Sequence, residues 1–183
     1  VIFGKHNMQN LTAARLACVS LGMDDHSFYY AMQSFSGASK RLQLLYESEN
    51  LTVYQDFAHA PSKVRATVLA VREKHPDAHL IACLELHTFS SLNPEFLPQY
   101  RDALKGADEK VVYYSPHTLA IKKLPDLSVE LLSGYFNESA LLVATSPQEL
   151  EKTVMGLKRK NPMVILWMSS GRWDGVDLLE ASV

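Results

Sequence analysis

The 183-residue sequence has little cysteine and little net charge, and it lacks long apolar runs. The formal charge of −2 gives no electrostatic footprint for nucleic acid or an anionic membrane. The longest apolar runs, such as Met163–Met168, fall far short of the roughly 20 residues of a membrane span. No signal peptide is visible. Cys18 and Cys83 lie inside apolar patterns, so we expect both to be buried in a cytoplasmic protein.

Several common catalytic signatures are also missing. The sequence contains neither G-x-x-x-x-G-K-[ST] nor G-x-G-x-x-G, which excludes a P-loop and a standard dinucleotide fingerprint within it. It has no C-x-x-C, H-E-x-x-H or G-x-S-x-G. His75 and His79 are four residues apart, but Pro76 between them argues against one helical face. We therefore predict no metal ligands in this sequence.

The first 37 residues indicate two helices. Asn7 can cap a helix over residues 7–21, and its apolar positions are Leu11, Ala14, Cys18 and Leu21. Gly22 is a stop signal. Asp24 can cap a second helix, with an apolar face of Phe28, Ala31, Met32 and Phe35. The helical pattern then breaks, and we place a domain boundary near Gly37.

From residue 38 onward, strand patterns alternate with helical ones. A hairpin is predicted at residues 42–47 and 51–56, with further strands at 79–86, 110–115, 140–145 and 163–169. Helices are predicted from residue 61 or 62, and at 96–105, 129–136 and 147–158, while residues 173–181 close the chain. Strands that are apolar on both faces imply a parallel sheet covered on both sides. The predicted fold is α/β, a mostly parallel sheet with helices on both faces, preceded by a short helical segment.

In such sheets, ligands bind beyond the carboxyl ends of the strands. The polar residues of the domain are concentrated there, in segments 56–59, 85–91, 115–117, 145–146 and 169–174. One of these segments contains SSGRWDG, a glycine-containing turn at residues 169–175. Such a turn can present backbone N–H groups to an anion, or it can simply let neighbouring elements pack closely.

Three stretches together carry a family resemblance. They are GKHNMQN (4–10), FSGASKR (35–41) and VYQDFAHAPSKVRATV (53–68). Their order and spacing resemble the Mur ligases, the ATP-dependent amide ligases of bacterial cell-wall precursor synthesis. The similarity is greatest to the murein peptide ligase branch and the UDP-N-acetylmuramate–alanine ligases. Later segments also fit, namely CLELHTFSS (83–91), KVVYYSP (110–116) and ILWMSSGRWDG (165–175).

The resemblance implies a domain organisation. Mur ligases have a UDP-binding domain, a central ATPase domain with the P-loop, and a Rossmann-like C-terminal domain. Residues 1–37 then correspond to the helical end of the central domain, and residues 38–183 to the C-terminal domain. The implied cofactors are ATP and Mg²⁺, with the metal ligands expected in the missing central domain. A fragment of this kind should not catalyse the full reaction.

The resemblance also implies the partners. They are UDP-N-acetylmuramic acid and either a murein peptide or L-alanine, together with the missing N-terminal and central domains of the same chain. No nucleic acid or membrane partner is expected. A different reading also stays open, in which the chain is a stand-alone module that binds a nucleotide or a cell-wall peptide without catalysis.

Four residues are implied in nucleotide binding. Asn7 matches a family asparagine that hydrogen-bonds adenine, and His6 lies beside it. Arg41 matches the second arginine of a family pair that reaches the ATP phosphates, because a guanidinium suits oxyanions. Asp56 matches a carboxylate that binds ribose hydroxyls or holds the linker.

Four others are implied at the reaction centre and the amine-substrate site. His59 matches the first histidine of a His-His-Pro motif and is the catalytic candidate, although the second histidine is Ala60 here. Relatives carry an arginine-containing loop where this sequence has His87 and Ser90. Both can contact a carboxylate, and Arg172 can supply the missing permanent cation. The altered loop predicts a shifted amine-substrate preference.

Overall fold

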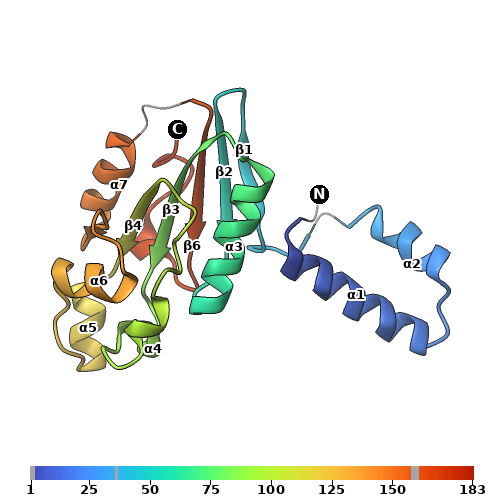
Figure 1. The fold of residues 1–183 in the computed structure, drawn as a ribbon, viewed down its shortest axis with the longest axis horizontal. Coiled ribbons are helices and arrows are strands. Elements are labelled where there is room, and N and C mark those ends of the chain that lie inside the picture. Colours follow the sequence, from blue (N-terminus) through green and yellow to red (C-terminus); the bar gives the residue numbers. More distant parts are fainter. Residues whose placement is uncertain (1–2, 36, 158–160) are drawn as a thin grey trace.

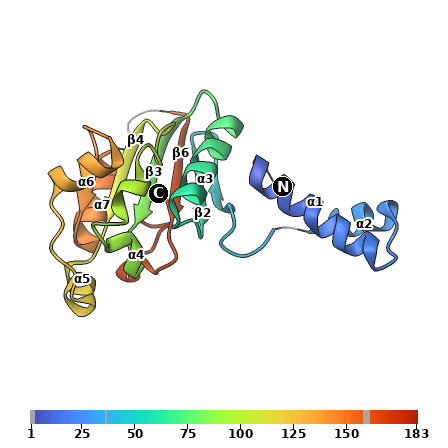
Figure 2. The same ribbon diagram turned by 60° about the horizontal axis from the view of Figure 1, so that its bottom comes forward.

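The computed structural model describes residues 3–35, 37–157 and 161–183, in two parts (Figure 1). A helix pair, α1 (Lys5–Ser20) and α2 (Asp25–Met32), lies beside an α/β unit that begins at residue 43. Both views show the helix pair extending away from the sheet, joined to it by one connecting segment (Figure 2). The assignment of residues 1–37 to a separate domain stays a prediction.

The α/β unit is built on a six-stranded sheet. The strands are β1 (Gln43–Glu47), β2 (Leu51–Asp56), β3 (His79–Glu85), β4 (Glu109–Tyr113), β5 (Leu142–Ala144) and β6 (Met163–Met168). Their order across the sheet is β1-β2-β6-β3-β4-β5. Only the β1–β2 hairpin pairing is antiparallel, and the other pairings are parallel. The predicted hairpin and mostly parallel sheet are confirmed.

The two faces of the sheet are covered separately. One face packs against α3 (Pro61–Lys74), α4 (Phe89–Leu92), the 3₁₀ turn η1 (Leu97–Tyr100), α5 (Pro116–Lys122) and α6 (Val129–Phe136). The other face packs against α7 (Pro147–Gly156) and the 3₁₀ turn η2 (Trp173–Gly175). Alternate residues of β6 enter the two cores: Val164, Leu166 and Met168 in one, Met163, Ile165 and Trp167 in the other. This alternation explains why the strand is apolar throughout.

Several helix starts follow the local sequence. Asp24 caps α2 as predicted, and its side chain accepts the Ser27 N–H. Helix α3 has Pro61 in its first turn, where the missing N–H is tolerated. Helix α6 covers the predicted residues 129–136.

The predicted helix at residues 96–105 is wrong. The chain makes only the η1 turn there, after the four-residue helix α4. Asp102 then adopts a left-handed backbone with φ of 57°, and its N–H donates to the Phe136 carbonyl. Helix α5 was not predicted, and α7 ends at Gly156, whereas the predicted end at residue 158 lies outside the described residues.

The first helix also differs from the prediction. It begins at Lys5 with Gly4 as its N-cap, so Asn7 does not cap it. The helix has no buried residue, Leu21 is 88% exposed and Cys18 is only partly buried. The predicted apolar face therefore has no core to enter, because α1 extends away from the sheet (Figure 2). Cys83 is buried as predicted, and burial raises the pKa of its thiol.

Across the part of the chain that the structure describes, we find no helix with both the length and the apolar character needed to cross a bilayer.

Candidate functional site

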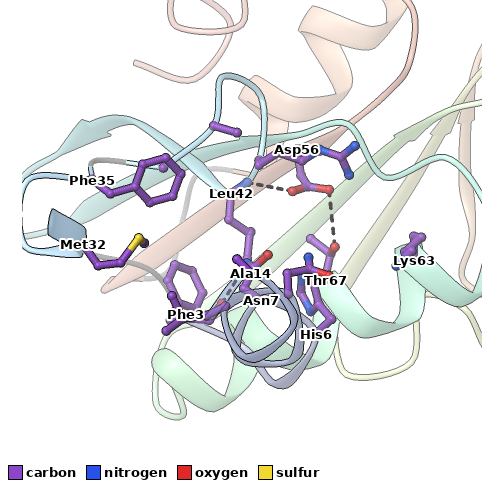
Figure 3. Close-up of a pocket in the computed structure, with 15 residues that line it drawn as sticks. Phe3, His6, Asn7, Ala14, Met32, Phe35, Leu42, Asp56, Lys63 and Thr67 are labelled. Carbon is purple, nitrogen blue, oxygen red and sulfur yellow. Dashed lines mark hydrogen bonds between the residues drawn. The ribbon is translucent and has the colours of Figure 1, made fainter. Parts of the chain in front are cut away.

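A cavity of about 590 Å³ lies between the helix pair and the carboxyl end of β2. Its walls come from α1, the connecting segment, the end of β2 and the first turns of α3 (Figure 3). The charged and polar side chains that line it include His6, Asn7, Arg41, Asp56, Lys63 and Thr67. All four residues predicted to bind the nucleotide thus line one cavity, although they come from three separate stretches of sequence.

Asp56 ties the connecting segment to the sheet. One carboxylate oxygen accepts the Leu42 N–H at 2.7 Å, and the other accepts the Ala58 N–H at 2.7 Å and the Thr67 hydroxyl at 3.4 Å. Burial raises the pKa of the Asp56 carboxyl group, whereas these backbone hydrogen bonds and the charges of Arg41 and His6 lower it. The Leu42 contact fits the implied role of holding the linker, and the implied role at the ribose stays a prediction.

His6 and Asn7 enter the cavity from the first turn of α1 (Figure 3). The Asn7 amide donates to the Phe3 carbonyl at 2.9 Å. A side-chain amide has two N–H donors and an acceptor oxygen, so this bond leaves further capacity for a ligand. Burial lowers the pKa of His6, the nearby Asp56 raises it, and Lys63 and Arg41 lower it again.

Two cations lie along the same cavity. The Arg41 guanidinium is 5.6 Å from the centre of the Phe57 ring, which supports its planar group. Lys63, on the first turn of α3, was not predicted as a site residue, although it lies only seven positions after Asp56. Apolar side chains complete the lining, among them Leu11, Met32 and Phe35. Cations beside an apolar wall suit a ligand that combines a flat ring with phosphates.

The donor set does not suit a magnesium ion. Asp56 is the carboxylate that lines the cavity, and backbone N–H groups already bind it. Among the described residues, no three His, Cys, Asp or Glu side chains form a group that could hold a metal. His75 instead contacts the Tyr54 hydroxyl at 3.0 Å, and His79 lies 3.6 Å from Glu109. We assign no magnesium ligand to these residues.

Gly4 permits the close approach of α1 to α3. Its φ is 87°, and a Cβ there would lie 2.6 Å from the Ala70 Cβ. We expect Gly4→Ala to weaken the first turn of α1 by about 2 kcal/mol, through strain and the clash. Hydrogen exchange of the Asn7 and Met8 amides, which donate to the Gly4 carbonyl, measures this opening.

Gly22→Ala is the matched control for Gly4→Ala. Gly22 also has a positive φ, of 94°, but open space surrounds the position of its missing Cβ. Strain alone then costs about 1 kcal/mol. Equal exchange of the Asn7 amide in wild type and Gly4→Ala would show that the α1–α3 approach is not tight.

His59 lies outside the lining of this cavity, beyond the end of β2. Its Nδ1 is 3.0 Å from the Phe57 carbonyl, and its own carbonyl accepts the Tyr100 hydroxyl. Ala60, in place of the second family histidine, is the N-cap residue of α3. The His59 residue is therefore held by local contacts and does not line the cavity.

A second group of polar residues lies where β3 and β6 end. Buried Glu85 accepts the Ser169 hydroxyl and the Trp173 N–H, and His87 Nδ1 is 3.7 Å from Glu85 Oε1. Of the other predicted residues, Ser90 is exposed on α4 and Arg172 is exposed on the loop after β6. Glu85 was in a predicted segment but was not singled out, because its partners are more than 80 residues away.

Two N–H groups of the SSGRWDG turn are used by contacts within the protein. The Gly171 N–H donates to the Ser169 hydroxyl at 2.6 Å, and the Trp173 N–H donates to Glu85 at 3.2 Å. Only the three-residue η2 follows, so no helix N-terminus faces this point. These contacts fit the packing-turn alternative, and anion binding at this turn stays a prediction.

A mostly parallel sheet with helices on both faces defines a Rossmann-like α/β domain. Comparisons with known proteins narrow this class, although no family model matches the chain. The UDP-N-acetylmuramate–L-alanine ligase of Chlorobium phaeovibrioides is 38% identical over 159 residues, which cover 83% of this chain and 33% of that protein.

Two solved structures share the fold over 99% of the chain. One is the UDP-N-acetylmuramate–alanine ligase of Thermotoga maritima, with a TM-score of 0.70 and 21% identity. The other is a murein peptide ligase of Psychrobacter arcticus, with a TM-score of 0.68 and 22% identity. The chain covers 37% and 38% of these structures, and so spans about a third of the length of its relatives. It belongs to the Mur ligase family of peptidoglycan synthesis and has the fold of the family's C-terminal domain.

Proposed function

We propose that the chain is the C-terminal part of an ATP-dependent ligase that joins a murein peptide to UDP-N-acetylmuramic acid during cell-wall recycling. The proposed peptide is L-alanyl-γ-D-glutamyl-meso-diaminopimelate. ATP would convert the sugar carboxylate to an acyl phosphate, and the peptide amine would displace phosphate to form the amide. Mg²⁺, held by the preceding domain, would neutralise phosphate charge.

The observation that carries this proposal is the shared cavity of His6, Asn7, Arg41 and Asp56. In the proposed complex, Asn7 binds adenine, with His6 beside it, and Arg41 binds the phosphates. Lys63 adds a second cation on the same wall. Fixed positive groups stabilise the charge that develops on phosphoryl oxygens during transfer.

His59 is the proposed catalytic residue. It lies on the segment between β2 and α3, beside the wall that carries Asp56 and Lys63. An imidazole there can hydrogen-bond the incoming amine or the phosphate. The free cysteines Cys18 and Cys83 are consistent with a cytoplasmic enzyme.

L-alanine is the second candidate for the amine substrate. The sequence relatives that are UDP-N-acetylmuramate–L-alanine ligases favour it. The loop at His87 should discriminate between the two substrates, because a tripeptide needs a roomier pocket than alanine. The preference for a peptide therefore depends on this loop.

The test uses the full-length protein that contains this chain. Phosphate release would be measured with ATP, Mg²⁺ and UDP-N-acetylmuramic acid, adding either the tripeptide or L-alanine. We expect release that depends on the tripeptide. Release with alanine alone would reassign the substrate, and ATP binding without any amine-dependent release would identify a non-catalytic binding module.

A further inference from the structure

Glu85 is a buried carboxyl group that connects two loops at the carboxyl edge of the sheet. It ends β3 and is 3% exposed. Its Oε2 accepts the Ser169 hydroxyl and the Trp173 N–H, both from the segment after β6. A buried carboxyl group costs free energy unless it is paired, and these two donors from the β6 segment provide that pairing.

The segment after β6 is held closely against Glu85. A Cβ on Gly171 would lie 2.6 Å from Glu85 Oε2 and 2.8 Å from His87 Cγ. Trp173 and Asp174 have left-handed backbones with φ of 55° and 48°. The Tyr113 hydroxyl on β4 donates to Asp174 at 2.7 Å and supports this conformation from the neighbouring strand. Three strand ends thus converge on one cluster.

The same carboxyl group faces the loop after β3. His87 Nδ1 lies 3.7 Å from Glu85 Oε1, the oxygen that the β6 segment does not use. Because the His87 ring also borders Gly171, it lies next to the residue that precedes Arg172. Glu85 therefore fixes the spacing between the loop of His87 and the loop of Arg172.

We propose that Glu85 is a positioning residue that assembles, from these two loops, the subsite for an amine substrate carrying a free carboxylate. This inference rests on the proposed ligase function and deepens it. His87 and Arg172 are the substrate-facing groups, and Glu85 acts through them. Burial raises the pKa of Glu85, while the hydrogen bonds from Ser169 and Trp173 and the nearby His87 lower it, and Asp174 raises it.

The experiment compares Glu85→Gln and Glu85→Ala in the full-length protein. Gln keeps an acceptor for Ser169 and Trp173 but loses the charge opposite His87, whereas Ala loses both. We expect the KM of the amine substrate to rise about tenfold in Glu85→Gln and further in Glu85→Ala, while the KM of ATP stays unchanged. We also expect the Trp173 amide to exchange at least about tenfold faster in Glu85→Ala.

Glu109→Gln is the matched control, because Glu109 lies 3.6 Å from His79 at the other end of the sheet. It should leave the KM of the amine unchanged. Ser169→Ala removes a Glu85 partner from the opposite loop and should raise that KM even if a Glu85 variant fails to fold.

Unchanged Trp173 exchange in Glu85→Ala would overturn the proposal whether or not the protein is a ligase. An unchanged amine KM in active variants, or equal rises in the KM values of amine and ATP, would also overturn it. Absence of amine-dependent phosphate release in the wild type would instead reject the proposed function.

Discussion

Asp56→Ala should lower the free energy of unfolding by about 3 kcal/mol, the largest stability effect that we expect in this chain. The substitution leaves the N–H groups of Leu42 and Ala58 without the carboxylate that accepts them. Each is a buried donor, and an unsatisfied buried donor costs about 1–3 kcal/mol. Urea unfolding followed by circular dichroism measures the change.

The control for this experiment is Asp126→Ala, since Asp126 is exposed. That variant should stay within about 0.5 kcal/mol of the wild type. A similar small effect for Asp56→Ala would mean that water replaces the carboxylate at no cost, and that the connecting segment is not held by Asp56.

Arg41→Ala should reduce kcat/KM of the full-length enzyme about 100-fold, the largest activity effect that we expect. In the proposed complex, the Arg41 guanidinium binds phosphate oxygens, and a charge-assisted pair of hydrogen bonds is lost. Arg41→Lys should recover only part of the loss, because an ammonium group lacks the planar fork and the stacking on Phe57. Initial rates at varied ATP concentration measure both variants.

Arg65→Ala is the comparison variant for Arg41. Arg65 is also an exposed arginine, but it donates to the Arg101 carbonyl on the α3 face of the sheet. The kcat/KM of the Arg65→Ala variant should match that of the wild type. If Arg41→Ala and Arg65→Ala were equally active, Arg41 would have no role at the phosphates.

Local patterns predicted much of the fold. Apolar runs such as that of β6 indicated strands buried on both faces, and caps such as Asp24 indicated helix starts. These features depend on residues close together in sequence. The cavity residues were found through the family resemblance rather than through spacing, because no periodicity relates Asn7 to Arg41 or Asp56. Their roles stay predictions, although the structure brings them to one cavity.

The remaining features depend on long-range contacts. The predicted helix at 96–105 does not form, and the Asp102 N–H instead donates to the carbonyl of Phe136, 34 positions away. The predicted apolar face of α1 is not buried, because an apolar pattern does not reveal whether a core lies opposite it. Glu85 was not singled out, since its partners Ser169 and Trp173 follow another strand.

The position of β6 has a consequence for synthesis of the protein on the ribosome. This strand is the last of the six to be made, yet it lies between β2 and β3 and pairs with both. Until residues 163–168 leave the exit tunnel, β2 and β3 each have an open edge that can pair with another chain. Folding of this sheet is therefore expected to wait for the last strand, and during that interval a nascent chain would benefit from a chaperone.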